Sequence, residues 1–170
     1  MGVNMKKFIV KMFILLSLSI QTGYCSDYSQ EEFINVSVYE KINPSIVFIE
    51  AMYNDEVSTG TGIVVGKNGE ILTSHHVVAG ASNIEVTTHK GEVYKAEIIY
   101  KPKNATDLIL IKIKSKSSLP VVKLGDSSVL KVGQKVLAIG NPFGFSGTLT
   151  TGIISLSFST LSFLDKFLSG

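Results

Sequence analysis

Short apolar runs separated by turn residues recur along the middle of the chain. Six of them, rich in Val, Ile and Thr, are predicted to be β-strands: residues 45–51, 61–65, 70–74, 84–88, 94–100 and 108–114. The breaks between them carry dipeptides that suit turns, such as Asn68-Gly69 and Lys90-Gly91. Apolar Ile84 and Val86 alternate with polar Glu85, so this run has one buried face. Six short strands with tight turns favour a small closed β-barrel.

A second group of strand-like runs follows the first. It covers residues 121–124, 135–139 and 148–155, with loops at 125–126 and 140–147. Three strands cannot close a barrel of the same size, and their outer edges would leave backbone N–H and C=O groups unpaired. The pattern therefore predicts an all-β chain with a complete first barrel and a partial second one.

The first 25 residues follow a different pattern. Three lysines precede an apolar stretch at 12–20, after which Gly23 and Cys25 supply small residues. A basic start, an apolar middle and small residues at the end are typical of a secretory signal peptide. The stretch is too short to span a membrane, which takes about 20 apolar residues. We expect cleavage after Cys25 and an exported protein, periplasmic or secreted, without a membrane span. A buried amphipathic helix and a lipidated Cys25 are the alternatives.

The segments on either side of the β region complete the predicted organisation. Residues 26–43 are polar and mixed, and a short helix is predicted over 31–41, ending before Pro44. Residues 156–170 combine Ser with spaced Leu and Phe, a spacing that suits an amphipathic helix. The predicted parts are a signal peptide (1–25), an N-terminal segment (26–43), a first β-barrel (44–116), a partial second β-barrel (117–155) and a divergent tail (156–170).

Charge and cysteine content narrow the classes of partner. The formal net charge is +2, but three of the 16 lysines lie in the predicted signal peptide, and all 14 acidic residues lie beyond it. The remaining 13 basic and 14 acidic residues give a net charge of −1, which argues against nucleic acid as a partner. The chain holds no Arg and a single cysteine, Cys25. We therefore predict no disulfide, no metal site and no cofactor.

Two kinds of chemically active residue stand at the ends of predicted strands. His75 and His76 follow the strand at 70–74, and an imidazole titrates near neutral pH, as a general base must. Asp107 precedes the apolar strand at 108–114, where a buried carboxylate is costly unless it is paired. Asp107 could simply cap a loop, or it could accept a hydrogen bond from a histidine ring and fix its tautomer.

Five stretches of this chain have a specific order and spacing. They are Gly60-Thr61-Gly62-Ile63-Val64-Val65, the run 69–78 that ends in Thr-Ser-His-His-Val-Val, the run 106–113, Leu124-Gly125-Asp126-Ser127, and the run 132–144 that ends in Ile-Gly-Asn-Pro-Phe-Gly. Together they resemble HtrA-type, trypsin-like serine proteases. The glycines of the first stretch are expected to let another backbone approach closely. The resemblance covers about 38–155 and implies a chymotrypsin-like double β-barrel.

The resemblance also assigns roles to residues. The family's histidine directly precedes a Val-Val pair, so the catalytic base is predicted to be His76 rather than His75. The family's aspartate falls on Asp107, which would orient the ring and stabilise its charged form. We expect the Asp107 carboxylate within hydrogen-bond reach of the His76 ring, with His75 pointing elsewhere. The implied function is serine endopeptidase in periplasmic protein quality control, with unfolded or misfolded proteins as substrates and a homo-oligomer, typically a trimer, as the assembly.

The nucleophile of the family has no counterpart in this sequence. The family's serine lies in a Gly-Asn-Ser-Gly-Gly stretch after the strand at 148–155, and the 170 residues hold no such stretch. Ser146 lacks the strand–turn–helix context of a nucleophile elbow and is interpreted as a loop serine. We therefore expect a chain truncated before the serine, its oxyanion donors and the PDZ domain, and inactive as it stands. The alternatives are a chaperone-like remnant that binds extended peptides, and the product of a broken gene.

Overall fold

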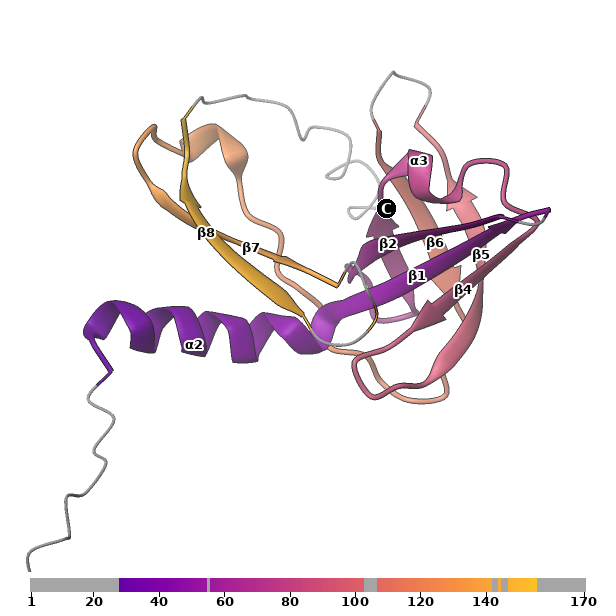
Figure 1. The fold of residues 1–170 in the computed structure, drawn as a ribbon, viewed down its shortest axis with the longest axis horizontal. Coiled ribbons are helices and arrows are strands. Elements are labelled where there is room, and N and C mark those ends of the chain that lie inside the picture. Colours follow the sequence, from indigo (N-terminus) through magenta and orange to yellow (C-terminus); the bar gives the residue numbers. More distant parts are fainter. Residues whose placement is uncertain (1–27, 55, 103–106, 142–143, 145–146, 156–170) are drawn as a thin grey trace, which may run out of the picture. The chain divides into compact units, whose positions relative to one another are not determined.

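The computed structural model describes residues 28–54, 56–102, 107–141, 144 and 147–155 (Figure 1). The predicted signal peptide, Ser146 and the tail at 156–170 lie outside the described residues. The chain divides into two units, Met1–Phe33 and Ile34–Gly170. No helix of the described part is long and apolar enough to cross a membrane.

In the first unit the structure describes the start of helix α2 (Gln30–Ile42). The backbone N–H of Ser29 donates to Glu32 Oε2 at 2.8 Å, and that of Glu32 donates to Ser29 Oγ at 3.2 Å. This reciprocal pair is a capping box, which satisfies two of the free N–H groups at a helix start. The hydrogen bond from the Ser29 backbone lowers the pKa of Glu32. The helix predicted over 31–41 is thereby confirmed to within one residue at each end.

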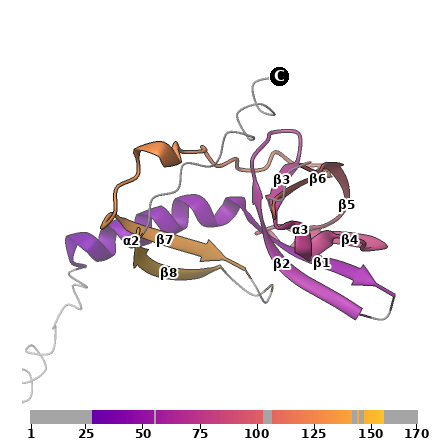
Figure 2. The ribbon, with the colours of Figure 1, turned by 90° about the horizontal axis from the view of Figure 1, so that it is seen from above.

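Six antiparallel strands of the second unit close into a barrel in the order β1-β2-β3-β6-β5-β4. Figure 2 shows these strands curving around into a ring. They are β1 (Ile46–Tyr53), β2 (Glu56–Val64), β3 (Glu70–Thr73), β4 (Asn83–Thr87), β5 (Val93–Tyr100) and β6 (Ile109–Ile113). A closed ring leaves no edge strand, so every strand has a partner on both sides.

Alternating side chains fill the interior of the barrel. On β4, Ile84 is 6% exposed and Val86 is fully buried, while Glu85 between them is half-buried, as the alternation predicts. Ile49, Ile71 and Ile111 come from three different strands, and each is 0% exposed. Burial of this much apolar surface provides the main driving force for folding. All six strands predicted for the first barrel are confirmed.

The glycines at the end of β2 have a steric role different from the one expected. A Cβ atom on Gly60 would lie 2.7 Å from the Val77 side chain, and one on Gly62 would lie 2.6 Å from that of Ile71. These glycines therefore make room for core side chains, and the expectation of a close backbone is wrong at this place. The close backbone occurs at Gly69, where φ is +87° and a Cβ would collide with the carbonyl oxygen of Ile113.

After the barrel the chain forms a two-stranded antiparallel sheet of β7 (Lys135–Gly140) and β8 (Thr148–Ile153). The strand expected at 121–124 is wrong: these residues form no strand. Val122 donates its N–H to the carbonyl of Val64 at 3.1 Å, which is an isolated hydrogen bond and no ladder. Among the described residues the fold is thus a complete barrel and a partial second sheet, and the predicted fold class is confirmed.

Candidate active site

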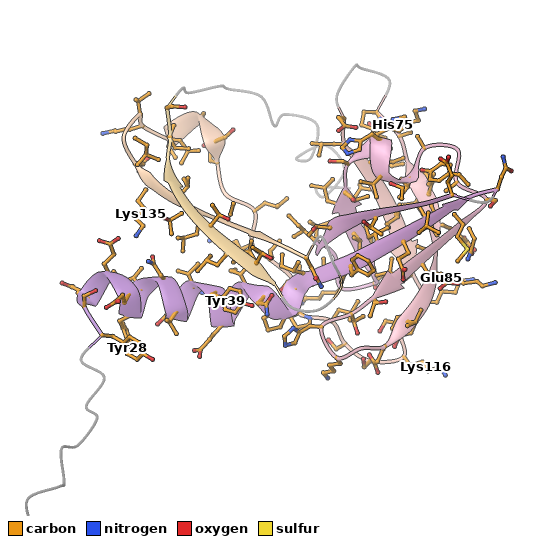
Figure 3. All side chains as sticks on the ribbon, viewed as in Figure 1. Tyr28, Tyr39, His75, Glu85, Lys116 and Lys135 are labelled. Atoms are coloured by element: carbon orange, nitrogen blue, oxygen red, sulfur yellow. The ribbon has the colours of Figure 1, made fainter. Side chains whose placement is uncertain are left out.

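The two residues singled out by the sequence lie on neighbouring strands at one end of the barrel. His76 belongs to the short helix α3 (His75–Val78), which follows β3, and Asp107 stands two residues before β6. Strands β3 and β6 are antiparallel, with Thr73 opposite Ile109. The end of β3 therefore meets the start of β6. In Figure 3, His75 marks this end of the barrel and Lys116 marks the opposite end.

Asp107 binds the start of α3 through three hydrogen bonds. Its Oδ1 atom accepts the backbone N–H of His76 at 2.9 Å, and its Oδ2 atom lies 2.5 Å from Nδ1 of the His76 ring. The backbone carbonyl of Asp107 accepts the N–H of His75 at 3.2 Å. An ionised carboxylate can only accept, so the hydrogen bond requires the proton on Nδ1, and in the neutral ring Nε2 then has the free lone pair. The predicted approach of the Asp107 carboxylate to the His76 ring is confirmed.

The electrostatics of the pair favour an ionised carboxylate. The backbone N–H of His76, followed by the ring hydrogen bond, holds the pKa of Asp107 below its ordinary value of 3.8. The side chains remain open to solvent, 72% exposed for His76 and 54% for Asp107. An ionised carboxylate that fixes the tautomer of an accessible imidazole can orient that ring for proton transfer.

A second set of contacts joins the stretches that carried the resemblance. The Thr73 hydroxyl, directly before the α3 turn, donates to the carbonyl of Thr61 at 2.8 Å. The Thr61 hydroxyl in turn accepts the backbone N–H of Asn141 at 2.8 Å. Thr61 therefore connects the wall of the barrel to the end of β7. All three residues lie in the stretches that carry the resemblance, but this role could not be predicted, because a hydrogen bond across 80 positions leaves no local pattern.

Among the residues that the structure describes, no three His, Cys, Asp or Glu side chains gather closely enough to share an ion. His75 and His76 are adjacent in a helical turn, and successive helix residues do not face each other.

The comparisons with known proteins define the family. Residues 60–165 match the model of the trypsin-like peptidase domain, so the chain belongs to this family. Serine protease HTRA1 of Xenopus laevis is 43% identical over 125 residues, covering 69% of this chain and 27% of the relative. A probable periplasmic serine endoprotease, DegP-like, of Chlamydia muridarum (strain MoPn / Nigg) is 48% identical over 97 residues, covering 56% of this chain and 19% of the relative.

A solved structure supports the same assignment. The HtrA-type protease AlgWS227A with tripeptide matches with a TM-score of 0.65 and 35% sequence identity, covering 72% of this chain and 40% of that one. The predicted resemblance to HtrA-type proteases is thereby confirmed. The chain spans about a quarter and a fifth of the length of the two curated relatives described above.

Proposed function

We propose that the chain carries the base and the orienting carboxylate of an HtrA-type serine endopeptidase, with His76 as the base and Asp107 as its partner. The observation that carries the proposal is the pairing of His76 Nδ1 with Asp107 Oδ2 at 2.5 Å. In this role Nε2 of His76 would take the proton from an attacking serine hydroxyl, and Asp107 would stabilise the imidazolium that forms. The order of the residues, His before Asp, agrees with the chymotrypsin-like arrangement.

We further propose that the 170 residues alone do not hydrolyse peptides. The support is the sequence, which holds no Gly-Asn-Ser-Gly-Gly stretch. In a working triad the loss of the serine costs about a millionfold in turnover. The purified chain should therefore neither digest unfolded casein nor react with a fluorophosphonate. Labelling that disappears in Ser146→Ala would contradict this and make Ser146 the nucleophile.

The roles of the two histidines are tested by completing the domain. The chain is extended after Ser155 with the corresponding remainder of the Chlamydia muridarum relative, and casein hydrolysis is followed. His76→Ala should reduce turnover at least about ten-thousandfold, because the nucleophile loses its base. His75→Ala is the matched control and should keep most of the activity. Activity that survives His76→Ala but not His75→Ala would reverse the assignment.

The setting of this activity is also a proposal. The signal peptide predicted at 1–25 and the relative named as a periplasmic endoprotease support export, and the family supports unfolded or misfolded proteins as substrates. A homo-oligomer is proposed on the same family ground. Mass spectrometry of the exported protein should find Ser26 as the first residue. An intact Met1 start or a lipid on Cys25 would count against cleavage at this place.

A second candidate function is the binding of extended peptides without cleavage. It is favoured by the two-stranded sheet, because β7 and β8 pair with no further strand among the described residues. Such an edge offers backbone donors and acceptors to an added strand. Titration with an unfolded polypeptide should then protect amides of β8 from hydrogen exchange. Protection confined to the barrel, or none at all, would remove this candidate.

A further inference from the structure

The helix that carries His76 is too short to satisfy its own backbone. Helix α3 has four residues, His75–Val78, whereas a helix leaves its first four N–H groups and its last four carbonyls without partners inside the helix. Its position therefore depends on groups outside it. At the first end these groups belong to Asp107, which accepts the N–H of both His75 and His76.

The other end of the helix is held from β1. The hydroxyl of Tyr53, the last residue of β1, donates to the carbonyl of Val77 at 2.9 Å. Val77 directly follows His76 in the chain and is 6% exposed. The Tyr53 ring is partly buried and packs against the barrel core. This hydrogen bond is therefore partly buried, and its loss would take this donor from the carbonyl of a buried residue.

The neighbouring residue of β1 holds the segment that follows α3. The Met52 carbonyl accepts the N–H of Ser82 at 2.8 Å and the Ser82 hydroxyl at 3.0 Å. The Val77 side chain also lies against Gly60, where a Cβ atom would have no room. The α3 turn thus packs against Gly60 of β2 and accepts a hydrogen bond from the end of β1. Neither contact involves the Asp107 carboxylate.

We propose that Tyr53 is a positioning residue for His76, an inference that rests on the proposed catalytic role of this histidine. Asp107 sets the tautomer of the ring directly, whereas Tyr53 fixes the turn from which the ring projects. Removal of the Tyr53 hydroxyl should let the turn shift and lengthen the contact between His76 Nδ1 and Asp107. The effect on the ring arises without any contact between Tyr53 and the imidazole.

The test compares Tyr53→Phe with Tyr39→Phe in the 170-residue chain. Tyr39 donates its hydroxyl to the carbonyl of Gly147 at 2.8 Å, so the control loses the same kind of hydrogen bond elsewhere. Long-range proton–nitrogen spectra at neutral pH report which ring nitrogen of each histidine carries the proton. Tyr53→Phe should speed solvent exchange of the His76 Nδ1 proton by up to about fivefold, the factor that corresponds to loss of the one net hydrogen bond between Nδ1 and Asp107. The signals of His89 and the amide signals of the strands remote from Tyr53 and α3 should stay unchanged.

The outcomes separate this inference from the proposed function. A change at His76 in Tyr53→Phe but not in Tyr39→Phe supports the positioning role. Equal effects of the two variants, or no effect of either, overturn it. Asp107→Asn is measured alongside: if it leaves the His76 ring unaltered, the proposed base–carboxylate pair itself fails, whatever Tyr53 does.

Discussion

The closed barrel and the two-stranded sheet are built from similar sequence but differ in how far their side chains are buried. Every strand of the barrel pairs on both sides, and Ile49, Ile71 and Ile111 are fully buried. In strands β7 and β8 every residue is at least partly exposed. Two strands alone are marginally stable in water, whereas a closed ring hides both its backbone and its core. His76 and Asp107 therefore lie at one end of the closed barrel, the region with the buried core.

The largest expected effect is a loss in the free energy of unfolding when a side chain of the barrel core is shortened. Ile111→Ala in the barrel should lower the free energy of unfolding by about 2–5 kcal/mol, since it leaves a cavity in a closed interior. Ile139→Ala in β7 is the matched variant. It should cost about 1 kcal/mol, because the side chain is half-buried and loses less transfer energy. Guanidinium unfolding followed by circular dichroism measures both. Equal losses would mean that β7 is packed as tightly as the barrel.

Two strand glycines are expected to show smaller single effects, which have opposite signs. Gly62→Ala should destabilise the barrel by about 1–3 kcal/mol, because its Cβ would press on Ile71, Ile49 and Val47. Gly152→Ala in β8 meets no atom within 4 Å and should stabilise by about 0.5–1 kcal/mol. Thermal unfolding of the two variants decides the matter. A stabilising Gly62→Ala would refute the packing described for β2.

The smallest effect concerns the barrel wall, where Lys112 Nζ lies 3.0 Å from Glu70 Oε1 on adjacent strands. Partial burial acts to raise the pKa of Glu70, but the hydrogen bond from Lys112 and nearby backbone N–H groups outweigh it, so the pKa falls below 4.5. A lowered pKa stabilises the fold above the ordinary carboxyl value, and this contribution is lost as the pH falls through the folded value.

The variant Glu70→Gln isolates this contribution. At neutral pH it should cost about 0.2–1 kcal/mol, since the Lys112 side chain is 40% exposed and solvent screens the pair. In acid the stabilities of Glu70→Gln and the parent chain should converge. A gap that stays constant from neutral pH to well below the carboxyl range would show that the charge of Glu70 plays no part.

The sequence predicted those features that have a local pattern. Short runs rich in Val, Ile and Thr between turn residues identified all six barrel strands. The resemblance to HtrA-type proteases led to the predicted pairing of His76 with Asp107. The start of β2 was missed because Glu56–Thr59 carry no apolar alternation. They are in the strand because they pair with the end of β1, and such a partner is visible only in three dimensions.

Two other errors have the same origin. The run at 121–124 has strand composition but makes only an isolated hydrogen bond, from Val122 to Val64, and a strand exists only where a ladder forms. The role of Gly60 depends on Val77, which lies 17 positions along the chain. The sequence shows a glycine at this position, but only the fold identifies the atoms that a side chain there would meet.

The His76–Asp107 pair is expected to form in the barrel without help from the second sheet. The most direct test disrupts the pairing of β7 and β8 with Thr150→Pro and Thr151→Pro together. Successive strand residues direct their N–H groups to opposite sides, so one proline must remove a bond to β7. Long-range proton–nitrogen spectra of the His76 ring should still show the proton on Nδ1, as in the parent chain. Loss of this tautomer on disruption of β7 and β8 would contradict the account, because the pair would then depend on the second sheet.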